Sequence, residues 1–293
     1  MMQTSIKVKL VTRELQTLTS GQPVSDGDGV KMTRVIGTPE LNMLDPFLLF
    51  DAFETDQAQD YIGGFPDHPH RGFETVTYLL AGRMRHKDSA GHEGVIEAGG
   101  VQWMTAGKGI IHSEMPEQAD GLLQGFQLWV NLPASEKMQI PAYQEFPANK
   151  IAVEHLDNGA EVRVIAGSTN NGTIGPVINQ YVNPVYMDVL LPKGQLFEQA
   201  VGADDNVFIF VVKGELSVGD LIRNIGHHQM GVLRDGDQVV VTANEESRFL
   251  LAAARPLNEP VARGGPFVMN TKAEVLQAFR DFKQNKFIKR TGN

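Results

Sequence analysis

The chain consists largely of short apolar or alternating runs separated by glycine-containing turns. The runs are rich in β-branched and aromatic residues, a composition typical of strands. Dipeptides such as Ala81-Gly82, Lys213-Gly214 and Asp235-Gly236 predict tight turns between them. No helical segments alternate with these runs, so the pattern predicts an all-β sandwich or barrel. The clearest predicted strands are Thr75–Leu80, Gly94–Glu97, Val101–Thr105, Gly125–Asn131, Glu161–Ile165, Val185–Leu191, Asn206–Val212, Gly214–Val218 and Gln238–Thr242.

The two halves of the chain share a similar order of predicted strands and glycine turns. Tyr78–Gly82 (YLLAG) ends a predicted strand much as Phe210–Gly214 (FVVKG) does, and each is followed by a further strand and a glycine turn. This similarity predicts two related barrels in tandem. The proline-containing segment Pro133–Pro147 is a plausible connector, so we place the boundary near residue 145, with domains 1–145 and 146–293.

One helix is predicted, close to the C-terminus. Thr271 and Glu274 have the spacing of a capping box, and the apolar residues that follow recur on one helical face. We expect this face to pack against a barrel, because amphipathic helices mostly cover a core; a partner-binding helix is the alternative. The apolar positions are Val275, Ala278, Phe279 and Phe282.

Composition and charge narrow the class of protein. Hydrophobic residues make up 42% and charged residues 21%, as in folded globular proteins. The absence of cysteine excludes disulfides, thiolate metal sites and a cysteine nucleophile. The first fifteen residues contain no continuous apolar stretch and no run is long enough to span a bilayer, so we expect neither a signal peptide nor a membrane segment. A cytoplasmic location fits, or a nuclear one in a eukaryote.

The net charge indicates which kinds of binding partner to expect. A formal charge of −9 argues against direct nucleic-acid binding, which usually requires a basic surface. An acidic protein can still bind a DNA-binding protein, so a regulatory role stays open.

The candidate chemistry lies between Gly63 and Pro116, a stretch that holds five of the eight histidines. It contains two pairs, His68-Pro-His70 and His112-Ser-Glu114. In an extended chain residues i and i+2 point to the same face, so each pair can present two ligands to one point. Two such strands facing each other across a barrel would supply three imidazoles and one carboxylate. Pro69 fits, because it favours an extended backbone and needs no ladder hydrogen bond.

This donor set suits a borderline divalent metal: Fe, Mn, Co, Ni, Cu or Zn. Four protein ligands leave room for water, O₂ or a substrate oxygen, whereas a structural zinc site would more often be closed and use thiolates. The alternative is that the histidines belong to an ordinary polar surface. Glu74, four residues after His70, competes for the role of carboxylate ligand. His86 and His92 flank a charged hairpin tip and are expected to be solvated.

Three segments resemble the pirin family of the cupin superfamily: Asp67–Pro116, Leu41–Phe50 and Arg255–Phe267. The resemblance implies a bicupin, in which two antiparallel β-barrels of the double-stranded β-helix type are followed by a C-terminal helix. It also implies one metal, usually iron and here expected as Fe(II), in the N-terminal barrel, and a metal-free C-terminal barrel. The implied ligands are His68, His70, His112 and Glu114, where many other cupins use the glutamate at the position of Glu74.

The resemblance implies two kinds of activity. The first is that of a quercetin 2,3-dioxygenase, which cleaves a flavonol-like aromatic substrate with O₂; Glu114 would then be both a ligand and the catalytic group that accepts the substrate's hydroxyl proton. The alternative is a metal-dependent regulator that binds a transcription factor or a metabolic enzyme.

Other side chains have weaker claims to a functional role. Four aromatic residues could line an apolar substrate pocket, although core packing is the simpler interpretation: Phe47, Phe50, Phe73 and Trp103. Four basic residues could form a partner surface, although a solvated hairpin would also account for them: Arg71, Arg83, Arg85 and Lys87.

Overall fold

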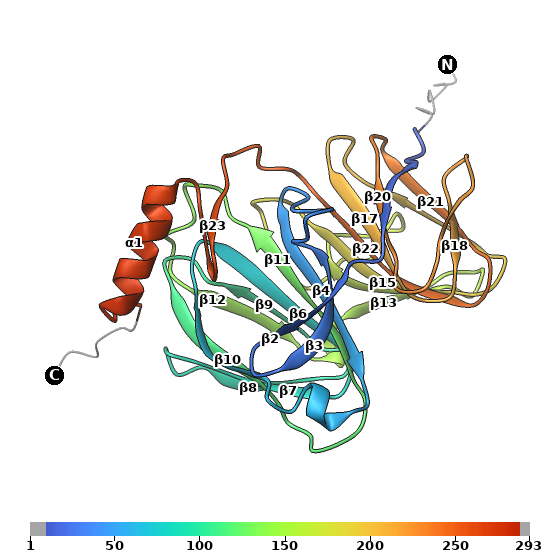
Figure 1. Cartoon of the computed structure of the whole chain (residues 1–293). Coiled ribbons are helices and arrows are strands. Elements are labelled where there is room, and N and C mark those ends of the chain that lie inside the picture. Colours follow the sequence, from blue (N-terminus) through green and yellow to red (C-terminus); the bar gives the residue numbers. More distant parts are fainter. Residues whose placement is uncertain (1–9, 288–293) are drawn as a thin grey trace. The chain divides into compact units, whose positions relative to one another are not determined.

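The computed structural model describes residues 10–287, so the prediction about an N-terminal signal concerns residues that lie mostly outside this range. Nearly all regular structure within the range is β (Figure 1), which confirms the all-β prediction. The chain forms two compact units. The larger unit comprises Gly21–Ala152, Pro176–Val182 and the chain from Pro256 onward; the smaller unit comprises the chain up to Ser20, Val153–Gly175 and Asn183–Arg255. The single boundary near residue 145 stays a prediction. Each of the two units is built from three separate segments of the chain, so one boundary does not describe them.

The larger unit has a seven-stranded, a four-stranded and a two-stranded antiparallel sheet, in the orders β12-β9-β6-β11-β4-β3-β2, β5-β10-β7-β8 and β23-β24. Figure 1 shows β10, β7 and β8 as one layer and β9, β6 and β11 as another. The strands are β2 (Gln22–Asp26), β3 (Val30–Ile36), β4 (Phe47–Thr55), β5 (Phe65–His70), β6 (Phe73–Ala81), β7 (Arg83–Asp88), β8 (Glu93–Glu97), β9 (Val101–Thr105), β10 (Ile110–Pro116), β11 (Leu123–Asn131), β12 (Ala142–Phe146), β23 (Ala262–Gly264) and β24 (Phe267–Met269).

Burial along these strands follows the sequence pattern. In β7 buried and exposed residues alternate strictly, so Met84, His86 and Asp88 face the interior. The inner strand β6 is buried on both faces from Phe73 to Leu79, although polar residues interrupt its apolar ones. The segment Pro133–Pro147 is more than a connector, because its β12 pairs with β9. The hydrogen-bonded ladder does not run from one sheet into the other, so the predicted barrel is a pair of facing sheets rather than a closed cylinder.

The smaller unit repeats this architecture. Its sheets have the orders β1-β20-β17-β22-β15-β14-β13 and β16-β21-β18-β19, and branched aliphatic and aromatic side chains fill its core. The predicted strands in the second half of the chain are all confirmed. The strands are β1 (Leu15–Thr19), β13 (Ala152–His155), β14 (Glu161–Ala166), β15 (Val185–Leu191), β16 (Leu196–Ala200), β17 (Asn206–Lys213), β18 (Leu216–Val218), β19 (Arg223–Ile225), β20 (Met230–Leu233), β21 (Gln238–Ala243) and β22 (Ser247–Ala254).

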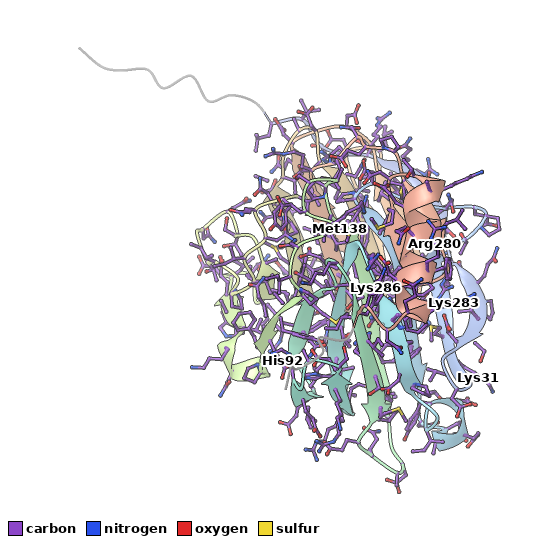
Figure 2. The ribbon with its side chains drawn as sticks, turned by 90° about the vertical axis from the view of Figure 1, so that its left-hand side faces the viewer. Lys31, His92, Met138, Arg280, Lys283 and Lys286 are labelled. Carbon is purple, nitrogen blue, oxygen red and sulfur yellow. The ribbon has the colours of Figure 1, made fainter. Side chains whose placement is uncertain are left out.

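The predicted C-terminal helix is α1, Lys272–Lys283, and both hydrogen bonds of its capping box are present. Val275 and Ala278 are buried, and the ring of Phe279 lies edge-on to Phe267 at 4.9 Å, so the apolar face packs against the larger unit as expected. Figure 2 shows Arg280 and Lys283 on the helix and Lys286 just beyond it. No described helix has the length and hydrophobicity that crossing a bilayer requires.

The cap gives a stability prediction. In Thr271→Ala the backbone N–H of Glu274 loses its acceptor, the Thr271 hydroxyl at 3.2 Å. We expect a loss of about 1 kcal/mol in the local stability of α1. Amide hydrogen exchange across Val275–Phe282 measures it. Thr271→Ser, which keeps the hydroxyl, is the control, and equal protection in both variants would contradict a capping role.

Candidate metal centre

Two neighbouring strands bring three histidines together. His68 and His70 lie on β5, the edge strand of the four-stranded sheet, and His112 lies on β10 beside it. His112 is directly opposite His68 in the antiparallel register, and Ile110 is opposite His70. The two strands were expected to face each other across the barrel; instead they are hydrogen-bonded neighbours. Pro69 is tolerated because an edge strand can spare the N–H that proline lacks.

The three imidazoles form a compact triangle. The ring centroids of His68 and His112 are 4.4 Å apart, those of His68 and His70 are 4.7 Å apart, and those of His70 and His112 are 5.0 Å apart. One ring nitrogen of each lies within 4.8 Å of the others, close enough for all three to bind one ion. The structure therefore brings together three of the four side chains that the sequence analysis placed at one metal, and their role as ligands stays a prediction.

The electrostatics of the cluster favour neutral imidazoles. Burial lowers the pKa of His70 and of His112 well below the ordinary value, and the neighbouring histidines lower it further. Neutral imidazole is the form that binds a metal. Both ring nitrogens of His112 and the Nδ1 atom of His70 are buried. None of these three atoms has a hydrogen-bond partner among residues 10–287. Buried polar atoms are rarely left unpaired, so these donor atoms fit a divalent transition metal.

His68 is oriented by the backbone of its own strand, β5. Its Nδ1 lies 2.9 Å from the carbonyl oxygen of Pro66, to which it donates when the proton is on Nδ1. This bond selects the tautomer whose Nε2 carries the free lone pair. His70 is held differently, by edge-on contacts with the rings of Phe73 at 5.1 Å and Trp129 at 5.2 Å.

Glu114 follows His112 by two residues on β10 and is buried. Its Oε1 accepts a 2.7 Å hydrogen bond from the hydroxyl of Thr77, on β6 of the facing sheet. Thr77 is also 2.8 Å from the side-chain amide of Gln127, which completes a chain of three polar groups. The imidazole triangle forms without Glu114, so its role as fourth ligand stays a prediction.

Glu74, the competing carboxylate, lies on the other face of β6. Side chains alternate along a strand, so Glu74 points away from the face on which Phe73 contacts His70 and Thr77 contacts Glu114. Its carboxylate accepts hydrogen bonds from Thr105 at 2.7 Å and Asn179 at 2.5 Å. Burial raises the pKa of Glu74 to about 7, although these bonds oppose the shift. Glu74 therefore holds the segment Pro176–Val182 to this sheet.

A cavity of about 590 Å³ opens beside the triangle. Its size is in the range of small-molecule sites. It is lined by His68, His70, Thr77 and Glu114 and by a mainly apolar wall: Met32, Leu49, Phe53, Phe65, Met84 and Trp129. Since Trp129 also contacts His70, the aromatic wall and the imidazole cluster adjoin.

The cavity differs from the aromatic set considered from sequence. Phe47, Phe50, Phe73 and Trp103 are fully buried core residues and do not line it, which confirms the simpler interpretation. Gln127 and Trp129 were missed, although their i, i+2 spacing on a predicted strand placed them on one face. Nothing local in the sequence indicated Met32, Leu49 or Phe53, whose strands β3 and β4 join the sheet through the long-range pairing of β4 with β11.

Two further expectations need correction. His86 is buried rather than solvated, and its Nε2 lies 2.6 Å from a carboxylate oxygen of Glu145, whereas the ring of His92 is exposed as expected. Arg71 cannot form part of a partner surface, because it is buried and donates to Asp281 of α1 at 2.8 Å.

The C-terminal segment contacts β5, the strand that carries His68 and His70. Arg71 directly follows His70, and besides Asp281 it contacts the ring of Phe287, whose centroid lies 4.3 Å from its guanidinium carbon. Its backbone N–H donates to Pro266, and its carbonyl accepts from Val268. The segment Ala262–Phe287, here called the C-terminal strap, therefore clamps the end of β5.

The comparisons with known proteins agree with this architecture. The family model described as Pirin matches residues 29–130, and the one described as Pirin C-terminal cupin domain matches residues 186–288. A pirin-like protein of Caulobacter vibrioides is 54% identical over 94% of this chain and 99% of its own length. Human pirin is 45% identical over 89% of each chain. The crystal structure of a quercetin 2,3-dioxygenase from Acinetobacter baumannii covers 94% of this chain and 99% of its own, with a TM-score of 0.87 and 34% identity.

The raised pKa of Glu74 predicts a pH effect on stability. Between about pH 4.5 and 7 the folded protein keeps a proton that the unfolded chain releases, so the contribution of Glu74 to stability falls as pH rises through this window. Glutamine does not titrate. The difference in the free energy of unfolding, Glu74→Gln minus wild type, should therefore increase between pH 4.5 and 7.5, by up to about 3 kcal/mol. Urea unfolding at both pH values tests this, with the exposed Glu245→Gln as a control that should show no such gain.

Proposed function

Because this chain belongs to the pirin family, we propose that it is a cytoplasmic mononuclear metal protein that acts as a quercetin 2,3-dioxygenase-type enzyme on a flavonol-like substrate. The observation that carries the proposal is the triangle of three imidazoles, in which buried nitrogens of His70 and His112 lack a hydrogen-bond partner among the described residues, beside an aromatic-walled cavity. The likeness to a solved quercetin 2,3-dioxygenase supports it. The overall reaction takes up one O₂, opens the flavonol ring and releases carbon monoxide.

The proposed ligands are His68, His70, His112 and, as the fourth, Glu114. One divalent transition metal is expected, Fe(II) first, with Mn, Co, Ni, Cu or Zn as substitutes. When bound, such an ion supplies Lewis-acid polarisation of a substrate hydroxyl and lowers its pKa.

The protein's own groups position the substrate. A planar aromatic molecule fits between Trp129 on β11 and the apolar side chains of β3 and β4, among them Met32 and Phe53. Burying its rings there removes water from the reacting face, which strengthens every electrostatic interaction inside.

Glu114 is the proposed proton acceptor. It lines the cavity, so a substrate hydroxyl can approach its carboxylate. Thr77 already donates to Oε1, so the lone pairs of Oε2 are the ones available to take the hydroxyl proton. A fixed carboxylate needs little reorganisation during the transfer.

Turnover by defined metal forms tests the function. Apo-protein loaded with Fe(II), Mn, Co, Ni or Cu is mixed with quercetin, and flavonol absorbance and O₂ uptake are followed together. His70→Ala and Glu114→Ala should each lower the rate by more than about 100-fold. His155→Ala, which removes an exposed histidine outside the site, is the control.

Two outcomes would redirect the assignment. Stoichiometric metal binding without turnover of any flavonol would favour the metal-dependent regulator that binds a protein partner. Conversion of the flavonol without O₂ uptake would indicate an isomerase instead.

The hydrogen bond from Thr77 to Glu114 gives a prediction about metal affinity. If Glu114 is the fourth ligand, Thr77→Val removes the hydroxyl that orients it, and the affinity for Co(II) should fall by about 10- to 100-fold. Competition against a chromophoric chelator measures this without turnover. Thr105→Val is the matched control, because it breaks an equivalent buried bond to Glu74 on the other face of β6. Equal losses in the two variants would mean that Thr77 acts only through general stability.

A further inference from the structure

Arg263 lines the cavity from the C-terminal strap. It lies on β23, and Gly265 and Pro266, just beyond that strand, line the same cavity. Among residues 10–287 its guanidinium has no hydrogen-bond or ion-pair partner. The side chain is exposed to solvent, yet the surrounding protein is close enough for burial to lower its pKa. An arginine remains protonated in such a setting, so Arg263 places at the cavity a positive charge that no carboxylate of the described residues contacts.

The other arginine of the cavity has an acidic partner. Arg34 on β3 makes two hydrogen bonds to Asp51 on β4, at 2.9 and 2.7 Å, and a third to Asp26 at 3.2 Å. The bond to Asp51 raises the pKa of Arg34, in contrast to Arg263. Both oxygens of Asp51 are thereby occupied, and its charge is balanced within the wall.

The remaining acidic group in the lining does not serve Arg263 either. Glu114 is held by Thr77 and adjoins the imidazole triangle, where the proposed function uses it. Arg263 is thus a planar, five-donor cation that faces an apolar cavity without a carboxylate of the described protein to match it. Guanidinium groups pair best with carboxylates, through two parallel hydrogen bonds.

We infer that Arg263 binds a carboxylate of the substrate, so that the natural substrate is an anionic aromatic hydroxy compound rather than a neutral flavonol. The hydroxyl part of this inference rests on the proposed function. The carboxylate part rests on the cavity and its unpaired guanidinium. Neutral flavonols would then be accepted through the aromatic wall alone and would bind more weakly.

Binding of two matched probes tests the inference. The probes are 3-hydroxyflavone and 4′-carboxy-3-hydroxyflavone, titrated by fluorescence into Zn(II)-loaded protein under nitrogen so that no oxidation occurs. Wild type should bind the carboxylate probe roughly tenfold more tightly or better, the scale of one charge-assisted contact. Arg263→Gln should abolish the preference and leave the Kd of the neutral probe within about twofold. Arg263→Lys should keep part of this preference, since lysine has the positive charge but not the two parallel N–H donors of a guanidinium.

The control and the contrary outcomes are distinct. Arg223→Gln, which removes an exposed arginine of the smaller unit, should change neither Kd. Equal affinity of wild type for both probes, an equal loss for both in Arg263→Gln, or no binding of either would overturn the inference. If the preference depends on Arg263 but no flavonol is oxidised by any metal form, the dioxygenase proposal fails and the carboxylate site stands.

Discussion

The larger unit depends on one constraint: three imidazoles converge at one point, and two of them, His70 and His112, are buried where the neutral form is favoured and where ring nitrogens lack hydrogen-bond partners among the described residues. Burial holds the pKa of His70 and of His112 low, and the neighbouring histidines lower it further, because two charged rings this close would repel each other. Among the described residues no side chain satisfies either nitrogen of His112. A shared divalent cation would resolve both problems, because it would accept the lone pairs of nitrogens that have no hydrogen-bond donor. The fold around the triangle holds these rings in position.

That support is distributed over the chain. The edge strand β5 carries two of the histidines, and an edge strand is held by one neighbour only. The C-terminal strap adds a second attachment directly after His70, through Arg71 and its contacts with Asp281 and Phe287. From the opposite sheet Trp129 packs on His70, and Thr77 orients Glu114. Segments far apart in sequence therefore fix the geometry of one small cluster.

The sequence predicted what depends on local rules. Strand period placed His68 with His70 and His112 with Glu114, and the capping box located α1 correctly. It did not predict that β5 and β10 are neighbours, because strand pairing is a long-range property. The cavity wall was missed for the same reason, since Leu49 and Phe53 are indistinguishable from core residues until β4 is placed. Glu74 could have been excluded only by knowing which face of β6 meets the triangle.

The cavity bears on the choice between an enzyme and a regulator. Both use the imidazole triangle, but a protein that only reports the state of a metal needs no space beside it. Protein interiors are otherwise close-packed, and unfilled apolar volume lowers stability. This unit nevertheless keeps a cavity of about 590 Å³ next to the imidazole triangle, bounded by aromatic side chains and by an arginine without a partner among the described residues. A small molecule with an apolar body and an anionic end would match both features of this wall. The cavity, more than the imidazole triangle, therefore favours the proposed chemistry on a small molecule.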